Sequence, residues 1–446
     1  MEDENFNHKL HITTDKEMDD VLSQYNLNQK SLMFALLLSI LVDVLGFTLT
    51  LPLLPEIADY FGANDFMVGV IISSNALTSL IFGPFWGWLS DRYGRKPILI
   101  ISQAGTFVAF IILALADGPF GIYIVIGARL LDGMFGGQLP IIRAIISDIT
   151  TPYTRPDKMS KVLAGVSLGA LFGPLLGGFL GEISWKIPPL VTAALSLSSI
   201  LITVKVLKET MPKKRREDLR RAKEQNSHLL RKSIFSKELI LRLFQTFFFN
   251  AILVMFNSAS PLVITERYGG GPTTIGLLTA AMILSMVFFA IAVFRPLRRK
   301  FGIKILSLVA VVSIIGAFLY FPFMEKIWMI SIFLPFYTFY MATARPIINV
   351  NTMKAVDATR QGEVSGWSTT TQSIAQTIFP LVSTGVIQIG GISIGTFSLN
   401  QYWILGILAA LIGVILLMLI IRDIRKYPKA FEKGPEKKKK EFEISL

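Results

Sequence analysis

Long apolar segments alternate with short polar segments along most of this chain. Each apolar segment has roughly 20 residues or more, the length that an α-helix needs to cross about 30 Å of hydrocarbon. Twelve such segments lie at 31–55, 66–89, 97–117, 120–143, 160–182, 187–207, 238–263, 273–294, 303–323, 327–349, 365–388 and 400–422. The pattern predicts an all-α membrane protein with twelve transmembrane helices, because a transmembrane barrel would show short alternating strands instead.

The composition agrees with this prediction. The 446 residues are 52% hydrophobic and 17% charged, with a mean hydropathy of +0.56, whereas soluble domains are about 25% charged. The net charge of +13 would favour nucleic-acid binding in a soluble protein. Here the basic residues flank apolar segments or lie in one central stretch, so they indicate membrane topology, and we expect no nucleic-acid partner.

A long basic stretch at 208–237 divides the spans into six plus six. The predicted order is an N-terminal tail (1–30), a six-helix bundle (31–207), the linker, a second six-helix bundle (238–422) and a basic tail (423–446). Lys and Arg are frequent in the loops on one side and rare on the other, which places both tails and the linker in the cytoplasm. We expect a multi-pass protein of the plasma membrane, monomeric in the lipid bilayer.

The two halves of the chain resemble each other. LSDRYGRK (89–96) aligns with LRRKFGIK (297–304), and a similar offset puts Arg129 near Arg345. Matches in the same order indicate a duplicated six-helix unit. Parallel repeats around a central axis are typical of transporters, which bind substrate between the repeats near the bilayer midplane.

Four stretches resemble signatures of the major facilitator superfamily. GWLSDRYGRK (87–96) is similar to its loop between spans two and three, and ARLLDGMFGG (128–137) is similar to its fourth-span signature. GALFGPLLGG (169–178) resembles the fifth-span pattern that marks antiporters, and LVDVLGFTLTLPLLP (41–55) resembles the first span of twelve-span drug:proton antiporters. The nearest group is the tetracycline-efflux and multidrug branch. The resemblance implies two pseudo-symmetric six-helix bundles that transport a small molecule.

The chain departs from these patterns at three places. Asp132 stands where the fourth-span signature usually has Gln, and Arg299 stands in the second half where the first half has Asp91. The tetracycline branch carries a membrane acid in its second half, and none is found in predicted spans eight to twelve. This argues against tetracycline as the substrate and places any coupling acid in the first half.

Charged residues inside the predicted spans are the candidates for proton coupling: Asp43, Arg129 and Asp132. An ionised carboxylate in mid-span costs about 2.5–3.5 kcal/mol, and intramembrane acids are functional by default. Asp43 is therefore expected to gain and lose a proton as the cavity opens to alternate sides; the structural alternative is a hydrogen bond to a neighbouring helix. Arg129 and Asp132 share one helix face, where they could form a static ion pair or tune the protonation of an aspartate.

The loop signature predicts a gate and not a substrate site. Its candidate residues are Gly87, Asp91, Arg92, Gly94, Arg95 and Lys96. We expect Asp91 to accept bonds from arginine and from helix N-terminal amides, and so to latch the two bundles together in one state. Gly87 is expected to allow close helix packing and Gly94 to allow the turn, while the basic residues satisfy the topology rule.

Two further groups of residues lie inside the spans. The fifth-span motif predicts a helix-packing groove with a bend at its proline, and its residues are Gly169, Gly173, Pro174, Gly177 and Gly178. Polar residues at similar depth are candidates for the lining of a substrate cavity, with an interhelical hydrogen bond as the alternative for each of them. They are Asn75, Asn250, Asn257, Gln372 and Gln376.

These patterns predict a secondary active transporter that exports a drug-like or amphiphilic small molecule in exchange for protons, by alternating access. Proton-coupled uptake or uniport of a metabolite is the alternative within transport. A non-transporting membrane sensor or scaffold is the alternative from another class. The sequence has no cysteine, its three histidines lie in polar stretches, and no nucleotide motif or catalytic cluster is evident. We expect no enzyme activity, no metal and no cofactor.

Overall fold

The computed structural model covers most of the membrane region. The described residues are 15–24, 27–151, 153–213, 216–217, 234–357, 360–394 and 397–431. Most of the predicted N-terminal tail, linker and C-terminal tail therefore lies outside the described residues.

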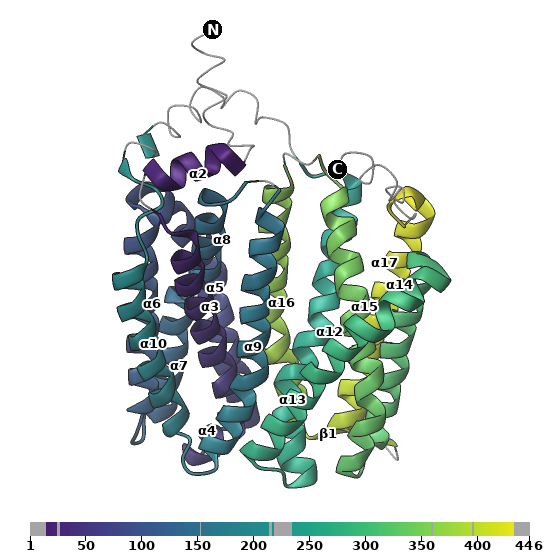
Figure 1. Cartoon of the computed structure of the whole chain (residues 1–446). Coiled ribbons are helices and arrows are strands. Elements are labelled where there is room, and N and C mark those ends of the chain that lie inside the picture. The colour runs from purple at the N-terminus through teal and green to yellow at the C-terminus, as the bar shows by residue number, and fades with distance from the viewer. Residues whose placement is uncertain are drawn as a thin grey trace. The chain divides into compact units, whose positions relative to one another are not determined.

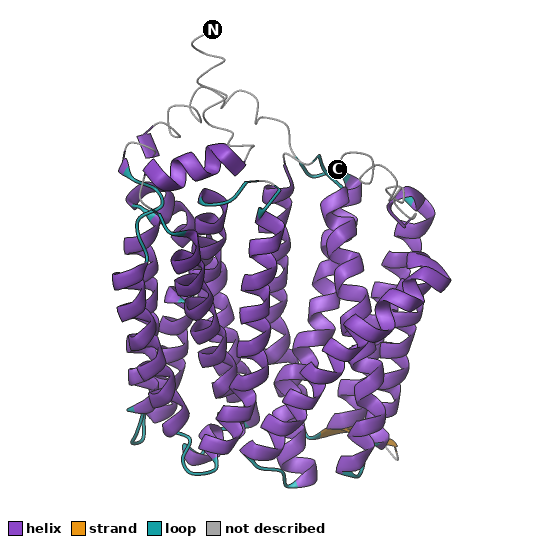
Figure 2. Cartoon of the chain, viewed as in Figure 1, coloured by secondary structure: helices purple, strands orange, loops and turns teal. Residues whose placement is uncertain are grey.

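Nearly all of the described residues are helical (Figure 1; Figure 2). The first half contains α2 (Asp15–Gln24), α3 (Gln29–Thr50), η1 (Leu51–Leu53), α4 (Leu54–Tyr60), α5 (Asp65–Tyr93), α6 (Arg95–Ala114), α7 (Gly121–Phe135), α8 (Gln138–Asp148), α9 (Arg155–Gly181) and α10 (Ile187–Val206). The second half contains α12 (Lys237–Tyr268), α13 (Pro272–Phe288), η3 (Phe289–Val293), α14 (Phe294–Tyr320), η4 (Phe321–Phe323), η5 (Ile327–Met329), α15 (Ile330–Lys354), α16 (Gln361–Ile389), α17 (Gln401–Lys426) and η7 (Pro428–Phe431). Each predicted span has a helical counterpart, which confirms the all-α fold class.

Nine helical segments of the described residues are long and apolar enough to cross a membrane. Interruptions and composition account for the other predicted spans. The predicted span 120–143 is split into α7 and α8, and the predicted spans 273–294 and 303–323 fall in one apolar segment, Pro272–Phe323. α16 is 29 residues long but richer in Thr and Gln than the other helices.

By its internal contacts the chain divides into two compact units. Unit 1 comprises Met1–Lys232, Val254–Ala281 and Gln376–Gly390, and unit 2 comprises Ser233–Leu253, Met282–Ala375 and Gly391–Leu446. This division passes through α12, α13 and α16, so a part of each belongs to unit 1 with the first six spans. The six-plus-six domain boundaries stay a prediction.

In unit 1, α9 packs along α3, the helix that carries Asp43 (Figure 1). A Cβ atom added at Gly169 would lie 3.0 Å from the carbonyl oxygen of Leu41, and the spaces at Gly173 and Gly177 are tighter still. The predicted glycine groove therefore lets the two backbones approach closely.

The same motif has a second neighbour in unit 1, the first turn of α13. A Cβ atom at Gly178 would lie 2.6 Å from the carbonyl oxygen of Pro272. Gly276 in turn packs against the backbone of Pro174, the proline inside α9. The fifth-span motif thus packs against two helices at once.

In unit 2, α14 packs against α15 and α17. Gly302, with φ of 75°, interrupts α14 near its start. Aromatic rings of α14, η4 and α15 form a cluster of Phe318, Phe321, Phe333 and Tyr337. A short antiparallel hairpin, β1 (Gly391–Ile394) and β2 (Phe397–Asn400), connects α16 to α17 (Figure 2).

Candidate functional site

The middle of α3 places Asp43 against the start of α8. Gln138 donates from Nε2 to Oδ1 of Asp43 at 2.9 Å, and its Oε1 accepts from the hydroxyl of Ser39 at 2.7 Å. Gln138 and Ser39 are buried, and Asp43 is partly buried. The amide therefore fixes the position of the carboxyl group. Gln138 was not predicted from the sequence, although it is a polar residue directly after a Gly-Gly pair inside a predicted span.

α7 holds the predicted ion pair close to α3. Nη1 of Arg129 lies 2.9 Å from Oδ2 of Asp132, and the two side chains are only 3% and 9% exposed. Asn75 of α5 donates to the same carboxylate oxygen at 2.8 Å. The guanidinium also lies over the ring of Phe47, one turn beyond Asp43, at 5.2 Å. One of the predicted cavity residues thus belongs to the charged cluster.

The fourth span is broken between Asp132 and Gln138. α7 ends and α8 begins on either side of Gly136 and Gly137. Side chains of α5 and α6 donate to the carbonyl groups at the break: Ser79 to Gly133, Trp86 to Met134 and Ser102 to Phe135. Irregular backbone at membrane depth is tolerated where its polar groups are satisfied or line a cavity, and broken helices recur at transporter binding sites.

The charges of this cluster do not balance when every group is ionised. Asp43 and Asp132 are close enough for their charges to interact, and Arg129 supplies one positive charge. Nε of Arg129 is buried and has no hydrogen-bond partner in the part of the chain that the structure describes, so Asp132 does not satisfy the whole guanidinium. An excess negative charge is costly in a medium of low dielectric constant, and one bound proton removes it.

A buried polar network extends from this cluster to α6 and α10. Nε2 of Gln103 lies 2.9 Å from the hydroxyl of Ser39, 3.1 Å from that of Ser199 and 3.0 Å from that of Thr203. Through Ser39 and Gln138, hydrogen bonds therefore connect Asp43 to α10. These partners are separated by tens of residues in the sequence, so no local pattern reveals them.

The predicted gating loop, 87–96, forms the end of α5 and the start of α6. Nη1 of Arg95 lies 2.6 Å from Oδ1 of Asp91, and Nε of Arg95 lies 3.1 Å from Oδ2 of Asp148 at the end of α8. Arg95 is buried, whereas the side chain of Asp91 is 56% exposed. Arg92 lies over two neighbouring aromatic rings. The loop thus ties three helices of unit 1 together, and a latch between bundles stays a prediction.

The N-terminal amides of α6 bind Glu209 and not Asp91. Its carboxylate oxygens accept from the backbone N–H groups of Arg95 at 2.9 Å and Lys96 at 3.1 Å, where negative charge suits the helix dipole. Gly94 has φ of 108°, as the predicted turn requires. The expectation that Gly87 allows close helix packing is wrong, because a Cβ atom at this position would meet open space.

The other predicted cavity residues lie in varied surroundings. Asn250 is buried and donates to a carbonyl oxygen one turn earlier in its own helix at 2.7 Å. Asn257 is exposed on α12, and Gln372 and Gln376 are partly exposed one turn apart on α16. For these residues a role in substrate binding stays a prediction.

An acid lies directly after the predicted twelfth span, in the last turns of α17, which extends to Lys426. Asp423 is fully buried with Arg242 of α12, and Nε of the arginine lies 3.3 Å from Oδ2 of the aspartate. Arg242 also binds Glu238 at 2.7 Å and the carbonyl oxygen of Asn351 at 2.5 Å. The predicted span stopped before Asp423 because the sequence does not show that a distant arginine neutralises it.

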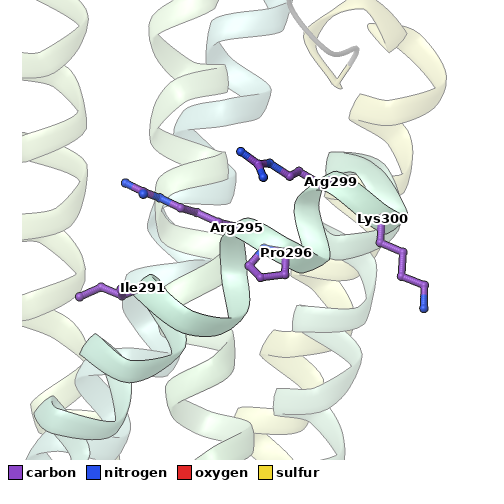
Figure 3. Close-up of a pocket in the computed structure, with 5 residues that line it drawn as sticks. All are labelled: Ile291, Arg295, Pro296, Arg299 and Lys300. Carbon is purple, nitrogen blue, oxygen red and sulfur yellow. The ribbon is translucent and has the colours of Figure 1, made fainter.

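A shallow pocket in unit 2 lies at the start of α14. Its lining residues are Ile291, Arg295, Pro296, Arg299 and Lys300. In Figure 3 the side chains of Arg295 and Arg299 point to one side of the helix and that of Lys300 to the other. The pocket contains none of the coupling candidates and lies on a predicted cytoplasmic loop, so it indicates a basic surface and not the transport site.

The geometry and the sequence signatures agree with a match to a known family. The sequence model of the Major Facilitator Superfamily matches residues 36–380, from α3 to α16. The chain belongs to the Major Facilitator Superfamily. It is therefore a multi-pass membrane transporter, and its family transports small molecules.

Relatives within the superfamily include resistance proteins. The chain is 26% identical over 295 residues to the tetracycline resistance protein, class B, of Escherichia coli, a match that covers 65% of this chain and 72% of the relative. It is 25% identical over 367 residues to multidrug resistance protein 2 of Bacillus subtilis (strain 168), a match that covers 79% of this chain and 88% of the relative. A solved D-xylose-proton symporter matches 86% of this chain and 96% of its own, with a TM-score of 0.68 and 14% identity. That likeness shows the fold alone.

Proposed function

We propose that this protein exports a drug-like or amphiphilic small molecule across the plasma membrane in exchange for protons. The relatives at about 25% identity are tetracycline and multidrug resistance proteins, which supports export of such compounds. The antiporter motif of the fifth span packs directly on the helix that carries Asp43, which supports a role for that packing in the transport cycle.

The observation that carries the proposal is the unbalanced charge of the cluster formed by Asp43, Arg129 and Asp132. Asp132 has a guanidinium and an amide as partners, whereas Asp43 has the neutral amide of Gln138. We therefore assign the exchangeable proton to Asp43. An acid inside the membrane that lacks a cationic partner is favoured in its neutral form until water reaches it.

Protonation of Asp43 changes the contact between α3 and α8. The bond from Gln138 is charge-assisted only while the carboxylate is ionised, and such bonds are stronger than neutral ones. Binding a proton weakens this bond at the break in the fourth span, where the backbone is already interrupted. We infer that proton binding loosens α8, whose other end is joined to Arg95 through Asp148.

Transport in proteoliposomes tests this assignment. Three probes, tetracycline, rhodamine 123 and fluorescein, would be followed under an imposed pH gradient. We expect the wild-type protein to move at least one of them against the proton flow, and Asp43→Asn to lose gradient-driven flux while retaining exchange of the same probe without a gradient. Asp59→Asn is the matched control, because it removes an exposed carboxylate of α4, beyond the end of the predicted span that holds Asp43.

The outcomes separate the alternatives. Undiminished gradient-driven flux in Asp43→Asn would contradict the coupling assignment. Movement of a probe in the same direction as the protons would favour uptake, and flux of no probe under any gradient would favour the sensor or scaffold alternative.

A further inference from the structure

Arg345 lies deep inside α15, about four turns from its start and about two and a half turns from its end. Its side chain is exposed, and among the described residues no ion pair, hydrogen bond or ring contact involves it. A cationic side chain at this depth is costly, and such residues usually face a water-filled cavity on a substrate or ion pathway.

The position of Arg345 on α15 separates it from the lipid-facing side. Asn349, one turn later, is also exposed and lies on the same face. The large exposed apolar residues Ile332, Phe336 and Val350 lie about 140–180° around the helix from Arg345. The apolar side of α15 suits contact with lipid. The opposite side, which carries Arg345 and Asn349, suits contact with water.

No carboxylate of the second half lies at the depth of Arg345. Between residues 238 and 426 every acidic residue is at or near a helix end: Glu238, Glu266, Glu325, Asp357, Glu363 and Asp423. Two of them are bound to Arg242. The charge that compensates Arg345 must therefore come from outside this half of the chain.

We propose that Arg345, assisted by Asn349, binds the anionic group of the transported molecule. The substrate is then an amphiphile that carries a carboxylate, sulfonate or phosphate group. A guanidinium presents several N–H donors in a planar fork that matches such oxyanions, and the bound anion supplies the counter-charge that the second half lacks at this depth. This inference names the substrate class of the proposed exporter. It rests on the proposed function only for the direction of transport.

Equilibrium binding of two dyes that share a xanthene ring tests the proposal. Fluorescein is anionic and rhodamine 123 is cationic, and both would be titrated by fluorescence polarisation against the purified full-length protein in detergent. We expect fluorescein to bind more tightly. Arg345→Gln should weaken fluorescein binding about tenfold or more, because a charge-assisted bond is lost, and leave rhodamine 123 unchanged.

Matched variants distinguish charge recognition from a structural effect. Arg345→Lys keeps the charge without the fork and should lose less fluorescein affinity than Arg345→Gln. Arg295→Gln removes a cation from the surface pocket of Figure 3 and should change neither dye. If Arg345→Gln does not give a monodisperse protein, Asn349→Ala carries the same expectation of a selective loss for fluorescein.

Equal weakening of both dyes, or tighter binding of rhodamine 123 by the wild-type protein, would overturn the anion site. Binding in detergent needs no gradient, so the two proposals can fail separately. Selective fluorescein binding without proton-driven flux would contradict export alone, whereas proton-driven flux without selectivity for the anionic dye would contradict the anion site alone.

Discussion

Each half of the chain has an arginine in its fourth predicted span, and the two, Arg129 and Arg345, differ in their surroundings. The side chain of Arg129 is 3% exposed and paired with Asp132, whereas Arg345 is exposed and forms no ion pair or hydrogen bond among the described residues. The sequence repeat aligns them loosely, but Arg129 lies about two turns into α7 and Arg345 about four turns into α15. The two arginines that the sequence repeat aligns therefore do not share the same surroundings.

The difference teaches how burial decides what a charge can do. A buried charge without a partner is destabilising, so Arg129 requires its aspartate and the pair is complete before any ligand arrives. Arg345 keeps part of its hydration and can exchange water for an anion. We infer a division of labour in which the first half exchanges the proton and Arg345 of the second half binds the substrate anion.

The largest effect is expected when Arg129 loses its partner. Asp132→Asn removes the carboxylate that Arg129 binds directly, and breaking a buried pair in this way costs about 3–5 kcal/mol. Thermal unfolding in detergent would show a large fall in the melting temperature. Adding Arg129→Gln to Asp132→Asn should restore part of the loss, since the double variant buries no net charge there. If Asp132→Asn melts like the wild-type protein, the pair does not stabilise unit 1.

The sequence was sufficient for the fold because spans depend on length and apolarity, which are local properties. It also identified Asp43, Arg129 and Asp132, since charged residues inside apolar segments are conspicuous. It did not identify Gln138 or Glu209, because ordinary polar residues gain their importance from partners far away in the chain.

Two differences between the predicted spans and the helices have a similar physical origin. The predicted twelfth span ended before Asp423, because only the folded chain shows that Arg242 neutralises this acid inside the bundle. The predicted fourth span ran through Gly136 and Gly137 unbroken, although the side chains that satisfy the break come from α5 and α6. Neutralisation and hydrogen bonding between helices are tertiary properties that the pattern of one span does not contain.

An intermediate effect is expected when Arg345 receives the partner that Arg129 already has. Asn349→Asp places a carboxylate one turn away on the same face, where such pairs stabilise a helix by about 0.2–0.5 kcal/mol. The melting temperature should rise slightly, and fluorescein affinity should fall further than in Asn349→Ala, because the new carboxylate competes with the dye for Arg345. Unchanged fluorescein affinity in Asn349→Asp would show that Arg345 does not contact the anion.

The smallest effect is expected at an exposed ion pair whose geometry resembles that of the buried one. Nζ of Lys186 lies 2.7 Å from Oδ2 of Asp117, but the two side chains are 31% and 62% exposed. The hydrogen bond from Lys186 lowers the pKa of Asp117, and the same bond raises the pKa of Lys186. The contribution of Asp117 is therefore present above its ordinary pKa of about 3.9 and lost as the pH falls below it, and that of Lys186 is lost as the pH rises above about 10.4.

Between about pH 5 and pH 9 neither group of this pair titrates, and Asp117→Asn should melt like the wild-type protein throughout, because water replaces the lost partner of an exposed charge. Melting curves of Asp117→Asn and Asp132→Asn measured side by side then isolate burial, since the paired atoms are similarly close in both sites. An equal fall in the two melting temperatures would mean that pairing distance and not burial sets the effect. The contrast between Arg129 and Arg345 would then have to be explained by something other than their exposure to water.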